Sequence, residues 1–527
     1  MLNSQLGVFV GFIVRPVLCY NLFMKSFNYY QPNPSIDREL HDLKTKPASY
    51  WEKKGEKLAM DLFHYVYATV PAYKKFLKKH KIDGSKIKTL ADFKTLPLID
   101  KAGYLRISVY EELFPNRDLT GATTVSATSG STGEPFYFPR GEAHDEQYRY
   151  VAEIFSKNQF AIDKHTTLGI VGFGLGIWIG GMFTYKNFNV IAQKGYKLTL
   201  APIGTNKELF LKTLKKFGHN YDQVILMGYP PFIKDAIDHA ALYGINLKDY
   251  KIRILTAAEG FSERFREHLA AGAGLENSYR DIVNIYGTVE LGTMAHETAL
   301  SYLIRHLANN NKALAQSLFP NIGTVPTLAQ YYPQHAYFEQ IKGEVVGTGY
   351  GSSIPLLRYR FHDVGGVIKF TDMEALLAAQ GIDLQKEAAK AGIKDLLLKL
   401  PFVYVAERSD NTVILRGANV YASQVRNALD DRALSKFVTG KFTMMKKETW
   451  KADGYLEIHL ELKDKIKPTT ALKKKILSTI IADLRQYNSE YNDAYAHQSR
   501  KATPRLKFWP YQHQLHFGPG KQRWVKK

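Results

Sequence analysis

The sequence predicts an α/β protein, in which a large N-terminal domain with covered β-sheets precedes a small C-terminal α+β domain. Three observations lead to this class. The chain has 527 residues, which is too long for one hydrophobic core. Between residues 120 and 350, short β-branched runs alternate with helical patterns, which is typical of a mostly parallel sheet covered by helices. After residue 408 the pattern changes, and about 120 residues remain, which suits a compact domain of about 110 residues, a typical size for a separate domain.

The first 35 residues read as an apolar arm. Met1–Met24 is mostly apolar, but Arg15 and Pro16 divide it, and a membrane-spanning helix needs about 20 consecutive apolar residues. No basic residue precedes the apolar stretch, which argues against a secretory signal peptide. We expect a helical arm that packs on the protein body, with a shallow position in a membrane interface as the alternative.

The regular elements follow from the spacing of the apolar residues. Helical spacing covers residues 36–82, and a short helix is expected at Thr89–Phe93. The expected strands are Thr167–Val171, Asn189–Ile191, Gln223–Met227, Ile252–Thr256 and Asp281–Ile285. Between the strands, helices are expected at Lys207–Phe217 and Pro231–Tyr243. After the strands come an amphipathic helix over 298–316 and two helices within 373–399, which break near Gly381 and Gly392. In the C-terminal domain, Tyr455–Leu462 alternates like a strand and Thr470–Leu484 is helical.

The chain is strongly basic, with a formal net charge of +21. This charge favours anionic partners such as nucleotides, acidic membrane surfaces or nucleic acid. The sequence has no helix-turn-helix, RNA-recognition or zinc-finger signature, so we expect no specific nucleic-acid recognition and regard many lysines as a solvated basic face. The one cysteine, Cys19, excludes an intramolecular disulfide framework and a Cys-rich zinc site.

The most informative motif is a run of small residues that precedes Glu134 and Pro135. Glycine lets the chain approach a polyanion closely, and backbone N–H groups and hydroxyls can surround nucleotide phosphates. The run is not a Walker loop, because no lysine follows its last glycine. A polar surface turn is the alternative. The candidate phosphate-binding residues are Ser129, Gly130, Ser131, Thr132 and Gly133.

Further segments carry groups suited to a nucleotide. Ala258 and Glu259 follow an expected strand, where small residues leave room for a flat base. Tyr286–Glu290 also follows a strand, and it offers an aromatic ring, a hydroxyl and a carboxylate suited to Mg²⁺. Asp363 offers a carboxylate for the ribose hydroxyls, and Glu407–Asn411 marks the start of the C-terminal domain. Each segment is weak evidence alone, and their occurrence in this order is the stronger signal.

In this order the segments resemble the adenylate-forming superfamily and, within it, the phenylacetate–CoA ligase-like branch. The resemblance spans roughly residues 40–523 and rests on Ser129–Pro135, Tyr286–Glu290, Pro355–Asp363, Arg408–Asn411 and Arg416–Tyr421. After the apolar arm over 1–35, it implies a domain over 36–408 that binds ATP and a carboxylic acid, and a mobile domain over 409–527 that rotates between two half-reactions.

The resemblance also implies roles for individual residues. Glu290 would hold Mg²⁺ and take part in catalysis, and Lys521, in a Gly-Lys pair near the chain end, would reach the forming adenylate. Asp410 is the expected hinge between the domains, with a surface turn as the alternative. Besides Ser129–Gly133, the ATP- and AMP-binding residues would be Ala258, Glu259, Tyr286, Gly287, Thr288, Asp363 and Arg408.

The acyl group of the substrate should lie where two expected strands end. One strand is followed by the segment with Phe173, Gly174 and Trp178, and another is followed by Tyr229. Open α/β sheets bind ligands at this edge. The aromatic rings of these segments suit an aromatic or apolar acid, although such rings are equally common in protein cores.

The leading hypothesis is an ATP-dependent acid–thiol ligase that forms an acyl-adenylate and then an acyl-CoA, with ATP, Mg²⁺ and CoA as cofactors. One alternative keeps adenylation and transfers the acyl group to an amine, a hydroxyl or a carrier-protein thiol. A second alternative is a non-catalytic basic protein that binds membrane or nucleic acid. We expect a cytoplasmic protein, with peripheral membrane contact through residues 1–24 as an alternative. The sequence does not determine the oligomeric state, and a homodimer is one possibility.

Overall fold

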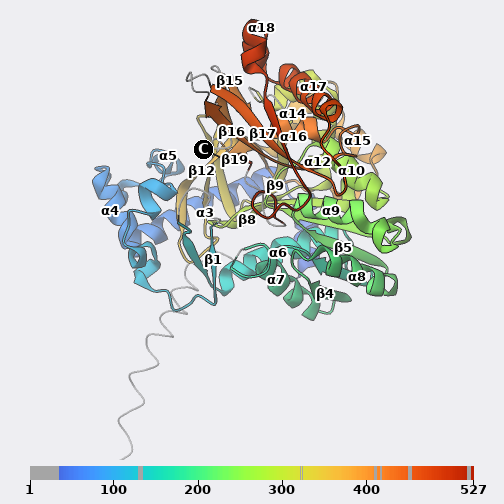
Figure 1. Cartoon of the computed structure of the whole chain (residues 1–527). Helices are drawn as coiled ribbons and strands as arrows, with labels where there is room; N and C mark the ends of the chain where they lie inside the picture. Colours follow the sequence, from blue (N-terminus) through green and yellow to red (C-terminus); the bar gives the residue numbers. More distant parts are fainter. Residues whose placement is uncertain are drawn as a thin grey trace, which may run out of the picture.

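The computed structural model describes residues 35–128, 134–177, 179–320, 322, 325–408, 412–415, 418–448, 454–518 and 524–526 (Figure 1). The expected N-terminal arm therefore lies outside the described residues, apart from Ser35.

The described chain begins with three helices, in the region where residues 36–82 predict helical structure. They are α2 (Ile36–Thr45), α3 (Ala48–Thr69) and α4 (Pro71–Lys79), and Pro71 occupies the first turn of α4, where its missing N–H costs nothing. The short helix α5 (Leu90–Phe93) begins with a reciprocal capping box between Thr89 and Asp92. Every third or fourth side chain of α3 is buried, which explains why this sequence forms a helix that packs on the body.

The large domain is built on a sheet of 11 strands, in the order β10-β11-β12-β13-β9-β8-β7-β6-β5-β3-β4. Five strands run parallel to one another: β3 (Thr167–Val171), β4 (Leu198–Pro202), β5 (Gln223–Gly228), β6 (Ile252–Ala257) and β7 (Ile282–Thr288). The antiparallel part contains β8 (Gly292–His296), β9 (Thr327–Tyr331), β10 (Ala336–Ile341), β11 (Glu344–Gly349), β12 (Leu356–Ile368) and β13 (Phe402–Arg408).

The expectation of a mostly parallel sheet is wrong. Six of the ten strand pairings are antiparallel. The connections β7–β8, β10–β11 and β11–β12 are too short for a crossover, so these strands must turn back on their neighbours. The alternation of strands and helices holds only up to β7.

Four of the five expected strands are confirmed, and Asn189–Ile191 is wrong. These residues lie in helix α7 (Gly181–Gln193). The β-branched pair suggested a strand, but the buried positions recur every three or four residues, which is helical spacing: Gly181, Thr184, Asn187, Phe188 and Ile191. The strand next to β3 comes after this helix, as β4.

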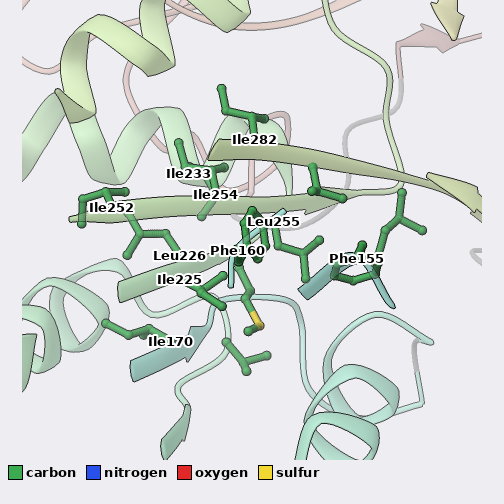
Figure 2. Close-up of a cluster of buried hydrophobic side chains, with 14 of the residues drawn as sticks. Phe155, Phe160, Ile170, Ile225, Leu226, Ile233, Ile252, Ile254, Leu255 and Ile282 are labelled. Carbon is green, nitrogen blue, oxygen red and sulfur yellow. The ribbon is translucent and has the colours of Figure 1, made fainter. Parts of the chain in front are cut away.

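Helices cover the parallel strands and close the main core. They are α6 (Glu142–Asn158), α7, α8 (Lys207–Phe217), α9 (Pro230–His239) and α10 (Glu263–Ala273), followed by the short α11 (Ser278–Asp281) (Figure 1). Figure 2 shows how side chains from the strands meet side chains from α6 and α9. The residues it labels are buried aliphatic and aromatic side chains: Phe155, Phe160, Ile170, Ile225, Leu226, Ile233, Ile252, Ile254, Leu255 and Ile282.

The segment expected as one helix over 298–316 forms two helices, α12 (Ala299–Asn310) and α13 (Lys312–Leu318). The break falls at Asn311, whose side chain accepts a hydrogen bond from the Leu314 N–H and caps α13. The two helices expected within 373–399 are present as α14 (Phe370–Ala379) and α15 (Leu384–Lys390). Gly381 and Gly392 follow them with φ of 72° and 67°, which favours glycine.

The C-terminal unit has its own α+β fold and its own hydrophobic core. Strands β14 (Thr412–Leu415) and β15 (Ala418–Tyr421) form a hairpin, and β18 (Arg505–Trp509), β17 (Gly454–Leu462), β16 (Val438–Glu448) and β19 (Val525–Lys526) form a sheet in this order. Three helices pack on them: α16 (Ala422–Leu429), α17 (Thr470–Tyr487) and α18 (Ser489–Ala502). The sequence predicted β17 and most of α17.

None of the described helices is both long and apolar enough to cross a membrane.

Candidate active site

Two motif side chains are in contact, although their strands are not neighbours in the sheet. The Tyr286 hydroxyl, on β7, donates a hydrogen bond to the Asp363 carboxylate, on β12, at 2.6 Å. Three strands, β8, β9 and β13, separate β7 from β12 in the sheet order. Asp363 is also the register partner of Arg408 across β12 and β13. The structure thus brings three of the expected nucleotide-binding positions together.

Glu290 lies in the turn between β7 and β8, close to the same place. Its carboxylate forms an ion pair with Lys101 Nζ at 2.8 Å, and the Tyr359 hydroxyl donates to it at 3.4 Å. The Glu290 side chain is 12% exposed, so it is accessible from one side.

The surroundings of Glu290 fit a bound Mg²⁺ that relies on the substrate for most of its ligands. Mg²⁺ in nucleotide sites is usually held by one or two carboxylates, substrate phosphates and water. Among the described residues, no group of three or more His, Cys, Asp or Glu could form a complete metal cage. Glu290 therefore fits as a single carboxylate ligand, and Lys101 would balance its charge in the absence of the metal.

Arg140, at the end of β2, is a buried cation beside the site. The hairpin of β1 (Thr124–Ala127) and β2 (Tyr137–Arg140) flanks the Ser129–Gly133 run. The Arg140 guanidinium donates to Ser126 Oγ at 3.1 Å and to the carbonyls of Val289 and Gly351. Burial lowers its pKa to about 10, which still leaves it charged at neutral pH. Arg140 thus ties this hairpin to the turn that carries Glu290.

Two further cations come from the segment that begins at Lys101. Lys101 starts the short helical turn η2 (Lys101–Leu105), and Arg106 follows it. The Arg106 guanidinium donates to the carbonyl of Glu134, the residue after the expected phosphate loop. Sequence reasoning missed Lys101, Arg106 and Arg140, because each acts through contacts with residues far away in the chain.

The segment after β6 adopts an unusual backbone. Ala258 has φ of 79°, in the left-handed region that non-glycine residues rarely adopt. The Asn284 side chain donates to the carbonyl of Glu259 at 3.3 Å and helps to hold this turn. Ala258 is exposed, so its small side chain leaves an open surface at the end of β6.

Two of the residues expected to line an acyl pocket pack against each other. Phe173 and Tyr229 follow β3 and β5, and their rings meet edge to face with centroids 5.3 Å apart. Both side chains are buried, and burial raises the pKa of the Tyr229 hydroxyl. Both rings belong to the main hydrophobic core, so their role toward an acyl group stays a prediction.

The small domain packs against the large domain beside the Ala258 turn. The Ser262 hydroxyl donates to the Asp430 carboxylate at 2.5 Å, and Arg264 pairs with Asp483 at 3.3 Å. The Arg426 guanidinium donates to the Gly260 carbonyl and lies 4.1 Å from the ring centroid of Trp524. A small cavity at this junction is lined by residues of both domains, among them Glu259, Phe261, Asp430 and Trp524.

A second group of contacts joins the small domain to α9. The Tyr511 hydroxyl donates to Asp235 at 2.6 Å, and Lys463 pairs with Asp238 at 2.6 Å. Neighbouring positive groups hold the pKa of Asp235 at about 2, so this carboxylate stays charged. We call the arrangement in which these contacts and those of Ser262 and Arg426 are made the docked orientation.

Several expected site residues lie outside the described residues. They are Ser129–Gly133, Trp178, Asp410 and Lys521, and the side chain of Arg408. Gly287 and Thr288 lie at the end of β7, next to Tyr286, and Gly174 follows Phe173. Their expected roles stay predictions.

No protein-family model and no curated protein matches the sequence. The chain is similar to solved structures of a 2-hydroxyisobutyryl-CoA ligase. In the postadenylation state with R3-HIB-AMP the TM-score is 0.63 at 14% identity, and with 2-HIB-AMP it is 0.62 at 13% identity. In the thioesterification state with 2-HIB-AMP and CoA the TM-score is 0.51 at 14% identity. All three matches cover 95% of this chain and 94% of that chain.

These matches include both domains, because they cover nearly the whole length of each chain. The chain therefore has the fold of an adenylate-forming acid–CoA ligase.

Proposed function

We propose that this protein uses ATP to activate a carboxylic acid as an acyl-adenylate and then transfers the acyl group to CoA. The observation that supports this most is the contact of Tyr286 with Asp363, which is the register partner of Arg408, with Glu290 close by. The motif order predicts these residues as a nucleotide site, and the fold agrees with that function.

The proposed chemistry explains why such a site is needed. A carboxylate is a poor electrophile, because its leaving group would be oxide. Attack of the carboxylate on the α-phosphate of ATP displaces pyrophosphate and gives an acyl-adenylate. AMP then leaves readily when the CoA thiol attacks the acyl carbon. The protein then has to align the two reactants and neutralise phosphate charge, and these effects supply most of the acceleration.

In this proposal the residues share the work as follows. Asp363 and Arg408 hold the ribose, Tyr286 lies against the adenine, and Ser129–Gly133 surrounds the β- and γ-phosphates. Mg²⁺ bound at Glu290 would neutralise phosphate charge. Lys101, Arg106 and Arg140 add fixed positive charge around the loop and the turn.

The docked orientation supports a role in the adenylating half-reaction. The TM-score to the postadenylation structures exceeds that to the thioesterification structure of the same enzyme, 0.63 against 0.51. Trp524, three residues after Lys521, lies in the docked orientation beside the Ala258 turn. Lys521 is therefore the residue that we propose to contact the reacting phosphate.

Product analysis tests the proposed acceptor. The protein is incubated with ATP, Mg²⁺, CoA and a panel of aromatic and apolar acids, and the products are separated by mass spectrometry. We expect AMP, pyrophosphate and an acyl-CoA for at least one acid. If acyl-adenylate accumulates with CoA but is consumed by an amine, a hydroxyl or a carrier protein, that nucleophile is the acceptor and CoA is not.

Asp363→Asn should weaken ATP binding without abolishing the chemistry. Loss of a charge-assisted hydrogen bond to a ribose hydroxyl costs about 1.5–3 kcal/mol, so the KM for ATP should rise about 10- to 100-fold. The wild type should discriminate against 2′,3′-dideoxy-ATP, and the variant should lose that discrimination. Tyr286→Phe is the matched control, because it removes the hydrogen bond to Asp363 but keeps the carboxylate and the ring. Equal discrimination in wild type and Asp363→Asn would contradict ribose binding by Asp363.

The docked orientation should be favoured at acid pH. Burial raises the pKa of Asp430 to about 6, above the ordinary value of 3.8, so the docked form binds a proton that an exposed carboxyl releases. Docking should therefore strengthen as the pH falls through 6, by about fourfold between pH 7.5 and 5.5. Asp430→Asn cannot titrate and should lose this dependence.

Distance measurements between spin labels test this prediction. Labels on cysteines that replace Leu242 and Lys473, in a Cys19→Ser background, report the separation of the two domains independently of activity. The docked fraction of the wild type should rise at pH 5.5, and that of Asp430→Asn should not. If both proteins respond alike to pH, another group controls the docking.

A further inference from the structure

Exposed apolar side chains are concentrated around the β1–β2 hairpin of the large domain. Of the 11 large hydrophobic side chains that are exposed among the described residues, seven lie on the β1–β2 hairpin or on the two segments that touch it. Four of them are Ile107, Val109, Val125 and Tyr137, which are 48–64% exposed. The other three, Leu175, Ile177 and Met182, are 40–46% exposed.

Hydrogen bonds and register show that these residues are neighbours. Val125 and Tyr137 lie on the same face of the hairpin, because the pairs Val125–Pro139 and Ala127–Tyr137 are two residues apart. The Tyr110 hydroxyl donates to the Tyr137 carbonyl at 3.0 Å and joins the 107–110 segment to the hairpin. On the other side, the Ala127 N–H donates to the Ile177 carbonyl at 3.2 Å.

A strongly basic helix borders this apolar strip. Helix α4 contains four lysines and no acidic residue, and it buries Ala72, Tyr73, Phe76 and Leu77 against the body. Its lysines therefore lie on the outer side, and Lys74, Lys75, Lys78 and Lys79 are exposed, as is Lys81 beyond the helix. The helix is tied to the 110–113 turn by an ion pair between Lys75 and Glu112 at 2.6 Å. We call the seven apolar side chains and these five lysines the hairpin face.

The hairpin face combines two features that suit the surface of an anionic membrane. Exposed apolar patches larger than single scattered side chains mark interaction sites. Aliphatic side chains gain by entering the boundary between headgroups and acyl chains, while lysines remain in contact with anionic headgroups. The aliphatic side chains offer no hydrogen-bonding groups to a nucleic acid, whereas the charge of α4 is complementary to acidic lipid.

We propose that the hairpin face docks the protein on an anionic lipid bilayer. The lysines of α4 attract the protein to the surface, and Ile107, Val109 and Val125 enter the interface. The face includes Leu175 and Ile177, next to the expected acyl pocket, so docking would bring that end of the sheet close to the lipid. The proposal does not depend on the proposed enzymatic activity.

Vesicle binding of the full-length protein tests the proposal. Flotation is measured with vesicles of phosphatidylcholine alone and with 30% phosphatidylserine, at about 0.1 M and 0.5 M salt. We expect binding to the anionic vesicles that is at least about tenfold stronger than to neutral vesicles and that falls with salt. Equal binding to the two kinds of vesicle would overturn the proposal.

Two double variants separate the parts of the hairpin face. Lys78→Glu with Lys79→Glu should weaken binding by about 30-fold or more, because each lysine near the surface contributes about fivefold. Ile107→Ser with Val109→Ser should weaken binding by about tenfold and keep the salt dependence. The control for the lysines is Lys473→Glu with Lys474→Glu on α17. The control for the apolar side chains is Leu242→Ser, since the Leu242 side chain is 78% exposed and does not belong to the hairpin face. Neither control should change vesicle binding.

Other occupants of the face give different results. Val10→Asp with Ile13→Asp changes the N-terminal arm in the full chain. If this variant alone abolishes vesicle binding while both hairpin-face variants bind normally, the arm is the membrane contact and the proposal fails. If no vesicle is bound and Ile107→Ser with Val109→Ser dissociates a dimer, the face joins two copies of the chain, and the proposal also fails.

Discussion

Lys521→Ala should slow acyl-adenylate formation by a factor of about 10²–10³, the usual loss for one charge-assisted contact in a transition state. The family resemblance implies that this lysine reaches the α-phosphate only when the small domain adopts the adenylating orientation. The segment that contains Lys521 is flanked by residues placed in the structure: Lys441 of the same domain donates to the Gly518 carbonyl at 3.3 Å, and Trp524 lies near Gly260 of the large domain in the docked orientation. Thioester formation from the adenylate should change far less.

Single-turnover kinetics of the two half-reactions separate these effects. Synthetic acyl-adenylate supplied to Lys521→Ala should restore acyl-CoA formation close to the wild-type rate. Lys507→Ala is the matched control, because Lys507 is an exposed lysine of the same domain. If Lys521→Ala is equally slow with the synthetic intermediate, Lys521 is not specific to adenylation.

Asp410→Pro should leave one half-reaction nearly intact and slow the other by about tenfold or more. Hinge residues absorb a large backbone change while staying outside the chemistry. Proline fixes φ near −65°, so it prevents the change between two backbone conformations. Asp410 lies between the last strand of the large domain, β13, and the first hairpin of the small domain. The resemblance places the rotation there.

Asp410→Gly provides the control for this experiment, because glycine permits both backbone conformations. It should retain both half-reactions. Pyrophosphate release and acyl transfer from synthetic adenylate are measured separately for the two variants. Loss of both activities in Asp410→Pro, or of neither, would mean that the domains do not pivot at this residue.

The sequence predicts several helices and four of the five parallel strands, because their signals are local, but it misses β4 and the helices α6, α7 and α10. Lys207–Phe217 matches α8, and β3, β5, β6 and β7 fall within a few residues of expectation. Strand β12 is not expected, because Leu356–Ile368 contains two charged arginines and two glycines, and glycine is depleted in strands. The strand expected at Asn189–Ile191 is wrong because its β-branched residues favour a strand locally. The helix that forms there is stabilised by burial against neighbouring elements, which the local sequence does not show.

In the candidate site, too, the sequence identifies residues with local motifs and misses residues whose contacts are distant in the chain. Motif spacing identified Tyr286, Glu290 and Asp363, and the structure brings them to one place without any pattern that links β7 to β12. Arg140 was missed because its partners Val289 and Gly351 lie 149 and 211 residues away. The contact of Ser262 with Asp430 likewise depends on how two separately folded domains meet.

Acid-dependent exchange of pyrophosphate into ATP tests the central proposal most directly, because it reports reversible acyl-adenylate formation whatever the acceptor is. With Mg²⁺ and the correct acid, labelled pyrophosphate should enter ATP, and Lys521→Ala should lower the exchange rate by about 10²–10³. Omission of the acid or of Mg²⁺ should abolish exchange. No exchange with any acid of a broad panel, from a protein that is folded and binds anionic lipid or nucleic acid tightly, would contradict the proposal and favour a non-catalytic binding protein.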